Sequence, residues 1–391
     1  MKRRLVFLFA VLGVIMLPHG EAARAAVREQ HDIERIVNAV VLPLMAEHTI
    51  PGMAVALTLE GERHVFTYGV ASKESGLQVA DDTLFEIGSI SKTFTATLAG
   101  YAQAKKALSL SDAASLHLPE LAGSSFDAVT LLELGTYTAG GLPLQFPDFV
   151  KNTQDMLAYC KSWRPRYAAG TYRLYSNPSI GLLGYLTAKS MGEPFDRLME
   201  QTLFPKLGLA DTFIRVPEAL MKRYAHGYTK TGKPVRVTPG VLDAEAYGVK
   251  TTASDLARFL EVNMNAVNLE DAMQEAIAAT HTGYFQVGVM TQGLGWEMYR
   301  YPADLDALVA GNSPAMILEP NRAARLSPSR APEAAMLFNK TGSTNGFGAY
   351  AAFVPARKLG LVLLANKNYP NSARITAACR IITALDAEPA R

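Results

Sequence analysis

Matching pairs of strands at the two ends of the chain restrict its fold more than any other feature of the sequence. Residues 52–69 contain two stretches rich in β-branched and aromatic residues, joined by a turn at Glu60–Glu62. Residues 348–366 repeat this form, with a turn at Pro355–Lys358. Each pattern is typical of a β-hairpin. The two ends are therefore expected to contribute strands to one sheet.

The middle of the chain shows helical signals instead. Apolar residues recur at helical spacing in four central segments and in one segment near the C-terminus, at 90–104, 153–163, 179–190, 254–265 and 371–385. Strand-rich ends around a helix-rich middle predict an α+β fold. In this fold an antiparallel sheet built from the N- and C-terminal segments is flanked by helices and carries an inserted, mostly helical lobe.

We expect a single domain over residues 26–391. Its sheet lobe is expected over 26–84 and 335–391, and a mostly helical lobe with pocket loops over 85–334. Two irregular stretches rich in Pro and Gly are expected to be long loops that border a binding site, at 210–252 and 302–334.

The first 25 residues have the order of a secretory signal peptide. Basic residues at 2–4 precede an apolar run at 5–17, and small residues around Ala25 offer a cleavage site. The 13 apolar residues are too few for a comfortable membrane-spanning helix. A membrane anchor or a buried helix is the alternative. We expect export to the periplasm, without stable membrane association after cleavage.

The charge balance argues against a nucleic-acid partner. The full chain carries 38 basic and 36 acidic side chains. Removal of residues 1–25 takes away four basic residues and one acidic residue, which leaves 34 against 35 and a net charge of −1. With 49% apolar and 19% charged residues, the composition is that of an ordinary globular protein. We expect a monomer.

The two cysteines, Cys160 and Cys379, lie 219 positions apart. Export permits a disulfide, but the sequence does not show that these two positions meet. We expect both to be free, small apolar residues on helices. The cysteines and the scattered histidines form no visible set of metal ligands, so neither a metal nor a cofactor is expected.

The first element with chemical meaning is the segment from Ser89 to Lys92, which opens an apolar helix. Positions i and i+3 share a helix face, so the Lys92 amine can reach the Ser89 hydroxyl. A serine becomes an effective nucleophile when a base takes its proton, and the positive end of a helix favours the developing alkoxide. Alone, Ser-x-x-Lys arises about once by chance in a chain of this length, and Ser89 can also be a helix cap.

A second element is the segment from Tyr175 to Asn177, which precedes a helix. Tyrosine has a reference pKa near 10, so Tyr175 acts as a base at neutral pH only if positive neighbours hold it partly ionised. Asn177 offers an amide donor and a carbonyl acceptor, which suit a lysine and a substrate amide. The alternative is a half-buried aromatic and a helix N-cap.

A third element, Lys340-Thr341-Gly342-Ser343, stands ahead of a late strand. A strand edge presents backbone groups that pair with an amide substrate, and Gly342 allows close approach. The positive charge of Lys340 can attract an anionic substrate and stabilise a tyrosinate. Taken alone, Lys340 would be interpreted as a solvated residue in a turn.

The three elements occur in the order shared by serine acyl-transfer enzymes that act on β-lactams and cell-wall peptides. Over nearly its whole mature length the chain resembles the class C β-lactamases, the AmpC-type cephalosporinases, particularly those of pseudomonads. Long matching strings carry the resemblance, among them LFEIGSISKTF (84–94), RLYSNPSIGL (173–182), LDAEAYGVK (242–250), QGLGWE (292–297) and NKTGSTNGFGAY (339–350). The stretch 303–333 matches least.

The resemblance implies a catalytic role for each of the three elements. Ser89 attacks the lactam carbonyl, and the N–H groups of Ser89 and Ser343 form the oxyanion hole. Lys92 and Tyr175 share the proton transfers, with Tyr175 as the usual candidate for activating the hydrolytic water. Which of the two is the base in acylation stays open. Lys340 completes the catalytic set.

The same resemblance assigns substrate contacts. Gln145 and Asn177 bind the side-chain amide of the substrate, and Tyr247 lines the side-chain pocket. Four further residues face the substrate carboxylate, namely Lys340, Thr341, Asn371 and Arg374. As alternatives, Asn371 is only a helix cap, Arg374 a solvated charge and Tyr247 a core aromatic.

We therefore expect a periplasmic serine β-lactamase that hydrolyses cephalosporins and penicillins through a Ser89 acyl-enzyme. The same residues would serve a D-alanyl-D-alanine peptidase or a lactamase-like esterase, and penicillin holds such a peptidase as a stable acyl-enzyme. A non-catalytic sensor of β-lactams or muropeptides would be acylated once, without turnover. Gln145 and the complete Lys-Thr-Gly at 340–342 favour the lactamase, since related esterases often lack the full motif.

Overall fold

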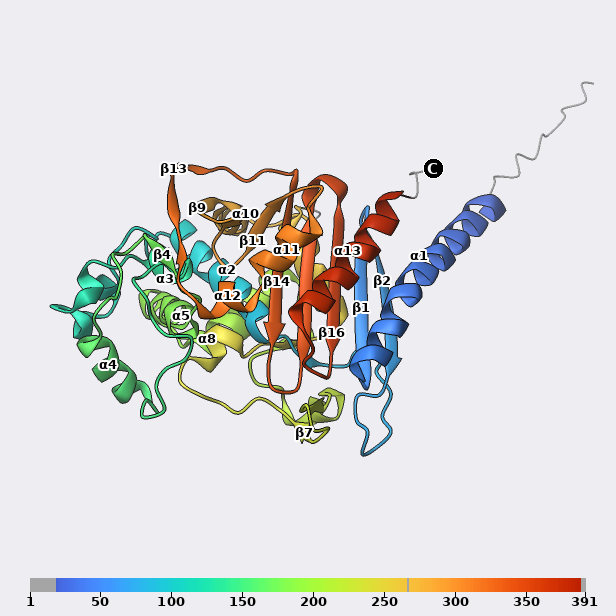
Figure 1. Cartoon of the computed structure of the whole chain (residues 1–391), viewed down its shortest axis with the longest axis horizontal. Coiled ribbons are helices and arrows are strands. Elements are labelled where there is room, and N and C mark those ends of the chain that lie inside the picture. The colour runs from blue at the N-terminus through green and yellow to red at the C-terminus, as the bar shows by residue number, and fades with distance from the viewer. Residues whose placement is uncertain (1–18, 266, 388–391) are drawn as a thin grey trace, which may run out of the picture.

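A nine-stranded antiparallel sheet forms the centre of the fold in the computed structural model, which describes residues 19–265 and 267–387 (Figure 1). The strand order is β13-β9-β10-β11-β14-β15-β16-β1-β2. The bounds are β1 Gly52–Leu59, β2 Glu62–Gly69, β9 Gly283–Val287, β10 Met290–Gln292, β11 Glu297–Arg300, β13 Ala324–Arg330, β14 Met336–Ser343, β15 Gly348–Val354 and β16 Leu359–Ala365.

Both predicted hairpins are confirmed, and they join the two ends of the chain. β1 pairs with β2, β15 pairs with β16, and β1 and β16 pair with each other, with Val362 opposite Ala56. Every residue of β15 and β16 is buried because helices cover both faces of the sheet. The predicted α+β architecture is therefore present.

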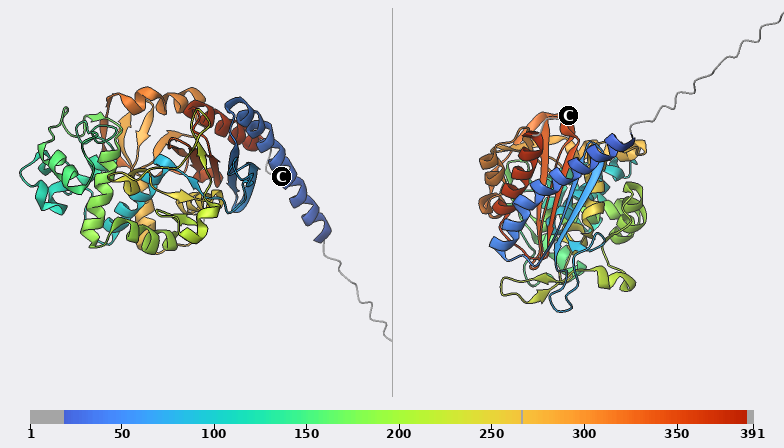
Figure 2. Two further views of the ribbon diagram at one scale, coloured as in Figure 1. Left: turned by 90° about the horizontal axis from the view of Figure 1, so that it is seen from below. Right: turned by 90° about the vertical axis from the view of Figure 1, so that its right-hand side faces the viewer.

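Helices cover the two faces of the sheet. One face carries α1 (His19–His48) and α13 (Asn371–Ala387), which lie next to each other (Figure 2, right). The other face carries α2 (Ser91–Ala104), α9 (Ala253–Asn263) and α10 (Asp271–His281). Of these, α2, α9 and α13 match helices predicted from apolar periodicity.

A second lobe lies beyond α2 and has its own apolar core (Figure 1). It contains α3 (Leu131–Gly135), α4 (Thr153–Ser162) and α5 (Asn177–Met191). The predicted helices at 153–163 and 179–190 are confirmed as α4 and α5. Between α2 and the preceding strand lies a single turn of 3-10 helix, η1 (Gly88–Ile90).

The structure departs from the sequence-based expectation over 283–334. Strands β9, β10, β11 and β13 from this part of the chain extend the sheet beyond the strands of the two ends. The predicted loop at 302–334 contains β13 and three short elements, α11 (Leu305–Gly311), α12 (Pro314–Leu318) and β12 (Asn321–Arg322). β13 is an edge strand with no buried residue, so its sequence shows no apolar alternation.

The predicted loop at 210–252 holds short elements, among them β6 (Gly227–Tyr228), β7 (Pro234–Val235) and α8 (Asp243–Tyr247). Cys160 lies on α4 and Cys379 on α13, and both are free, as predicted. Burial raises the pKa of the Cys160 thiol to about 12 and that of Cys379 to about 11, so both thiols are poor nucleophiles.

Residues 1–18 of the predicted signal peptide lie outside the described residues. The expected cleavage point at Ala25 falls within α1, and among residues 30–48 of this helix, whose side chains are described, the first buried one is Ile33. Within 19–265 and 267–387, no helix has the length and apolar character needed to span a bilayer.

Candidate active site

Ser89 lies on η1, directly before α2, where the chain touches the end of β14. Gly88 adopts a φ of +50°, and a Cβ on this residue would lie 2.5 Å from the backbone nitrogen of Ser343. A Cβ on Gly342 would overlap the carbonyl oxygen of Ile87. These two glycines therefore allow η1 and β14 to meet, which brings the backbones of Ser89 and Ser343 together.

Lys92 lies one turn after Ser89 and is fully buried. Its Nζ donates hydrogen bonds to Ser89 Oγ (2.9 Å) and to the carbonyl oxygen of Ala246 (2.8 Å). Burial lowers the pKa of Lys92 to about 8, although the neighbouring Tyr175 opposes this. A fraction of the amine is thus neutral near physiological pH and able to accept a proton.

Tyr175 is a buried phenol near two lysines and Arg173, whose guanidinium carbon lies 5.4 Å from the centre of the ring. The centre of its ring lies 5.2 Å from Lys92 Nζ and 5.0 Å from Lys340 Nζ. Burial opposes ionisation of Tyr175, but the charges of Lys340 and Lys92 outweigh it and hold the pKa below its usual value. The Ser89 hydroxyl also favours the ionised form of Tyr175. The phenol oxygen therefore lies near the nucleophile.

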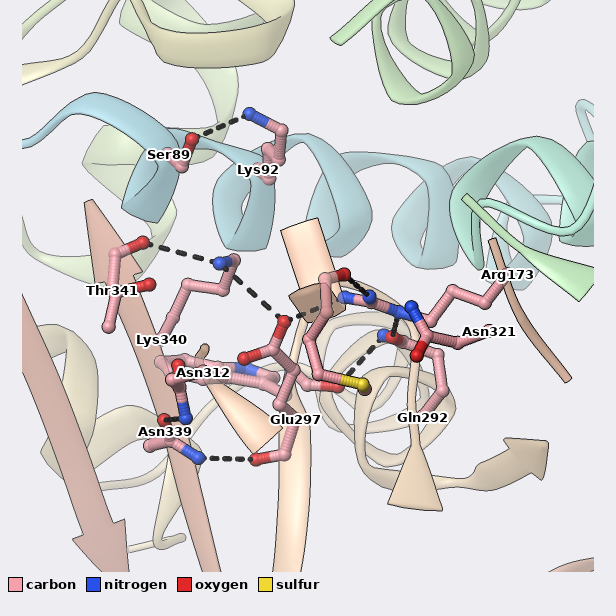
Figure 3. A network of polar contacts seen from close by, with 12 residues as sticks. Ser89, Lys92, Arg173, Gln292, Glu297, Asn312, Asn321, Asn339, Lys340 and Thr341 are labelled. Carbon is pink, nitrogen blue, oxygen red and sulfur yellow. Dashed lines mark hydrogen bonds and ion pairs between the residues drawn. The ribbon is translucent and has the colours of Figure 1, made fainter. Parts of the chain in front are cut away.

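Lys340 belongs to a buried chain of charges that the sequence analysis did not identify (Figure 3). Its Nζ donates to the carbonyl oxygen of Thr341 (3.2 Å) and lies 3.8 Å from Glu297 Oε1. The same carboxylate oxygen accepts a hydrogen bond from Arg173 Nη2 (2.9 Å). Arg173 Nε in turn donates to Gln292 Oε1 (2.7 Å). Glu297 thus fixes the position of Lys340, and Glu297 and Arg173 both line the active-site cavity themselves.

One feature could have drawn attention to the pair of Glu297 and Arg173, namely a carboxylate at the start of a short strand. Glu297 follows Trp296 at the start of a short strand whose first three residues are buried, and a buried carboxylate needs a partner. The partner, Arg173, lies 124 positions away. No spacing rule connects residues so far apart, so the ion pair could not be predicted.

A cavity of about 190 Å³ opens beside Ser89 and receives most of the predicted residues. Among the side chains that line it are Ser89, Gln145, Tyr175, Asn177, Lys340, Thr341, Ser343 and Asn371. Elements from both ends of the chain and from the second lobe contribute to this one cavity. Among the described residues, no group of three His, Cys, Asp or Glu side chains is placed to hold a metal ion.

Asn177 does not cap α5, which was the alternative to a binding role. The cap is Ser176, whose Oγ accepts a hydrogen bond from the Ser179 N–H (3.0 Å). The backbone N–H of Asn177 donates to the carbonyl of Leu144 (3.0 Å), which joins the start of α5 to the segment between α3 and α4. Its side-chain oxygen is buried and has no partner within the described ranges. Asn177 therefore keeps an acceptor at the cavity.

Two predicted substrate contacts lie elsewhere. Arg374 is fully buried one turn along α13 and donates hydrogen bonds to the carbonyl of Gly342 (2.7 Å) and to Ser343 Oγ (2.9 Å). Its side chain supports the end of β14 and does not line the cavity. Tyr247 is half-buried on α8, next to the Ala246 carbonyl that holds Lys92, and is also outside the cavity lining.

Comparison with known proteins gives matches over almost the whole chain. A family model described as "Beta-lactamase" matches residues 37–385. A β-lactamase of Pseudomonas fluorescens is 59% identical over 355 residues, which cover 91% of this chain and 99% of that protein.

Solved structures agree with this match. A class C β-lactamase in complex with cefoxitin has a TM-score of 0.89 at 47% identity, covering 91% of this chain and 99% of that chain. The D-alanine carboxypeptidase AmpC from Burkholderia cenocepacia has a TM-score of 0.87 at 50% identity, covering 90% and 99%.

Proposed function

Because this chain belongs to the class C β-lactamases, we propose that it hydrolyses the amide bond of cephalosporins and penicillins through an acyl-enzyme on Ser89. One observation carries the assignment of the residues. The Lys92 amine donates to Ser89 Oγ at 2.9 Å, at the edge of a cavity that also contains Tyr175 and Lys340. A similar structure is described in complex with cefoxitin, which supports a β-lactam as the ligand.

Acylation begins with attack of Ser89 Oγ on the lactam carbonyl carbon. The hydroxyl proton passes to the pair formed by Lys92 and Tyr175, which together lower the cost of forming the nucleophile. The N–H groups of Ser89 and Ser343 stabilise the oxyanion, and each such donor typically contributes about 3 to 4 kcal/mol. The C–N bond then breaks as the lactam nitrogen takes a proton from Tyr175.

Deacylation reverses the proton transfers with water as the nucleophile. Tyr175, whose pKa Lys340 and Lys92 lower against the effect of burial, takes a proton from a water molecule that attacks the ester carbonyl. Ser89 then leaves and regains its proton. A positioned general base of this kind typically contributes a factor of about 10² to 10⁴ to the rate.

Substrate binding uses the remaining residues of the cavity. The side chains of Gln145 and Asn177 bind the amide of the substrate side chain, since both offer donors and acceptors. Lys340, Thr341 and Asn371 face the substrate carboxylate. Arg374 acts on the substrate indirectly, because it holds the backbone of β14 at Gly342.

Steady-state hydrolysis of a chromogenic cephalosporin by the purified protein tests this proposal. We expect multiple turnovers, with a rate that EDTA leaves unchanged. Ser89→Ala should abolish both turnover and the mass increase of the acyl-enzyme, while circular dichroism shows a folded protein. Turnover that survives Ser89→Ala would overturn the mechanism.

A second activity is favoured by the name of one similar structure, the D-alanine carboxypeptidase AmpC from Burkholderia cenocepacia. A peptidase would release D-alanine from a peptide ending in D-Ala-D-Ala and would be held by penicillin as a stable acyl-enzyme. A single stoichiometric burst with a cephalosporin, together with peptide hydrolysis, would favour this alternative. A burst without peptide hydrolysis would favour a sensor.

The setting of the enzyme is part of the proposal. Export to the periplasm follows from the basic and apolar order of residues 1–25. We propose a monomer there, which size-exclusion chromatography of the mature protein tests.

A further inference from the structure

A second cleft, of about 1000 Å³, lies away from the active-site cavity. It is bounded by the C-terminal part of α5, by α6 (Phe195–Leu198), by α8 and by the segment 214–239. Of the described residues, none lines both the cleft and the active-site cavity. Its walls are largely apolar, with Ile214, Val216 and Met221 among them. A concave apolar space with a few polar groups is the usual form of a small-molecule site.

The cations that line the cleft are already bound within the protein. Lys250 Nζ donates to the carbonyl oxygens of Ile214 (2.9 Å) and Gly248 (2.8 Å). The guanidinium of Arg236 stacks 4.1 Å from the ring centre of Tyr224 and donates to backbone carbonyls. These donors are therefore not available to an anion.

The two remaining cations lie near the rim. Arg215 forms an ion pair with Asp196 (3.4 Å). Lys189 is exposed, and its Nζ lies 5.4 Å from the ring centre of Tyr185. Glu193, also at the rim, pairs with Arg197 (3.2 Å). The rim charges thus largely neutralise one another.

The acids of α8 are different, because neither forms an ion pair within the described residues, and the carboxylate of Glu245 has only the backbone N–H of its own residue as a hydrogen-bond donor. The Glu245 side chain lines the cleft at 7% exposure. Among the residues that the structure describes, none forms an ion pair or side-chain hydrogen bond with the carboxylate of Glu245 or with that of Asp243. A buried carboxylate without a partner is costly to ionise. A positively charged ligand would supply the ion pair that Glu245 lacks.

We propose that this cleft binds a small organic cation, a protonated amine on an apolar body, with the ammonium group against Glu245. The apolar body packs on Ile214, Val216 and Met221, and Asp243 adds a second negative charge near the amine. Lys250 and Arg236 already bind backbone carbonyls, whereas Glu245 and Asp243 form no ion pair within the described residues, so the cleft favours a cation over an anion.

The proposed contact makes binding depend on pH. Burial raises the pKa of Glu245 to about 7, and Asp243 and Asp196 add to this. The groups around it are Asp243 and Tyr247 on α8, Asp196 on α6 and Lys189 on α5, while α2 contributes the uncharged Thr95. Since the carboxyl is protonated below about pH 7, affinity for an amine should rise between about pH 6 and about pH 8.

Isothermal titration calorimetry of the mature protein with benzylamine tests the proposal, with benzyl alcohol as the neutral probe of similar shape. At about pH 8 we expect benzylamine to bind at least about tenfold more tightly than benzyl alcohol. Glu245→Gln should remove this difference. Glu193→Gln, at the rim of the same cleft and already paired with Arg197, should leave it unchanged.

Equal binding of the two probes would overturn the proposal, as would an unchanged benzylamine affinity in Glu245→Gln. If that variant does not fold, the pH series on the unaltered protein decides instead. Benzylamine affinity that does not rise from about pH 6 to about pH 8 would then rule the site out. None of these readings depends on β-lactam turnover, so they are independent of the proposed function.

Discussion

The chemistry of Tyr175 depends on the two lysines beside its ring. Lys340 and Lys92 hold its pKa below the usual value against the effect of burial. If ionised Tyr175 is the base, kcat/KM should fall as the pH falls through this pKa. Lys340→Gln removes the larger of the two lysine effects and should raise the pKa of Tyr175. We expect the acid limb of the pH profile of kcat/KM to move up by about one pH unit or more.

The matched control for this change is Lys358→Gln. Lys358 is an exposed lysine that pairs with Glu60, so the variant has the same change in net charge far from Tyr175. Its acid limb should coincide with that of the unaltered enzyme. An unmoved limb in Lys340→Gln would show that Tyr175 does not depend on this lysine for its ionisation.

The raised pKa of Glu245 predicts how the stability of the protein depends on pH. The folded protein holds the Glu245 proton up to about pH 7, whereas the unfolded chain loses it near the ordinary value of 4.5. Stability from this group is thus present below about pH 4 and lost as the pH rises to about 7. Glu245→Gln mimics the protonated form and should stabilise the protein above about pH 7, by up to about 3 kcal/mol.

Chemical denaturation at about pH 4 and about pH 8 measures this effect. The advantage of Glu245→Gln over the unaltered protein should be present at the higher pH and absent at the lower one. An equal free energy of unfolding for the two proteins at about pH 8 would show that the carboxylate is not destabilised by burial.

At the scale of single residues, local spacing and the resemblance to class C β-lactamases predicted many of the residues that line the cavity. Ser89 and Lys92 are three positions apart, and the rule that joins them is a property of every helix. The ion pair of Arg173 with Glu297 joins residues 124 positions apart, and only the fold brings them together. Arg374 had the right charge for a carboxylate, but its position one turn deeper on α13 places it behind β14.

The start of α13 shows how one helix serves two purposes. Asn371 lines the active-site cavity, whereas Arg374 donates to Gly342 and Ser343 behind β14. Arg374→Gln leaves buried acceptors without donors, so we expect a loss of about 3 kcal/mol or more of stability together with a lower kcat. Asn371→Ala should raise KM with little change in Tm. Thermal unfolding and steady-state kinetics of the two variants separate these effects.

The opposite result would restore the original interpretation of Arg374. A variant Arg374→Gln with the Tm of the unaltered enzyme and only a raised KM would mean that the guanidinium contacts the substrate carboxylate after all.

At the scale of elements, length explains part of what the sequence could predict, although α10, with 11 residues, was not predicted while α4, with 10, was. Helices such as α2 and α5, with 14 and 15 residues, repeat their apolar positions often enough to be recognised. β10 has three residues and α11 has seven, which is too short for a period to be visible. β13 has the length of a strand but lies at the sheet edge, where neither face is buried.

At the scale of the whole molecule, α1 sets how much of the N-terminus the fold needs. Among its described side chains, at residues 30–48, the first buried one is Ile33, after the expected cleavage point at Ala25. We expect intact-mass spectrometry of periplasmic protein to give a chain that starts at or near residue 26. A deletion through Ile36 removes two buried isoleucines and should cost several kcal/mol, since each typically contributes about 2 to 5.

The β6–β7 hairpin lies at a point where the chain could be cut into two fragments that each hold part of the active site. Its exposed tip, at residues 230–233, separates Ser89, Lys92 and Tyr175 from Lys340 and Ser343. The same point divides β1 from β16, which pair in the sheet. A chain cut there would give two fragments, each inactive by itself. Hydrolysis of a chromogenic substrate would be observed only after the two fragments associate. If each fragment is fused to a different protein, hydrolysis would report whether these two proteins bind each other.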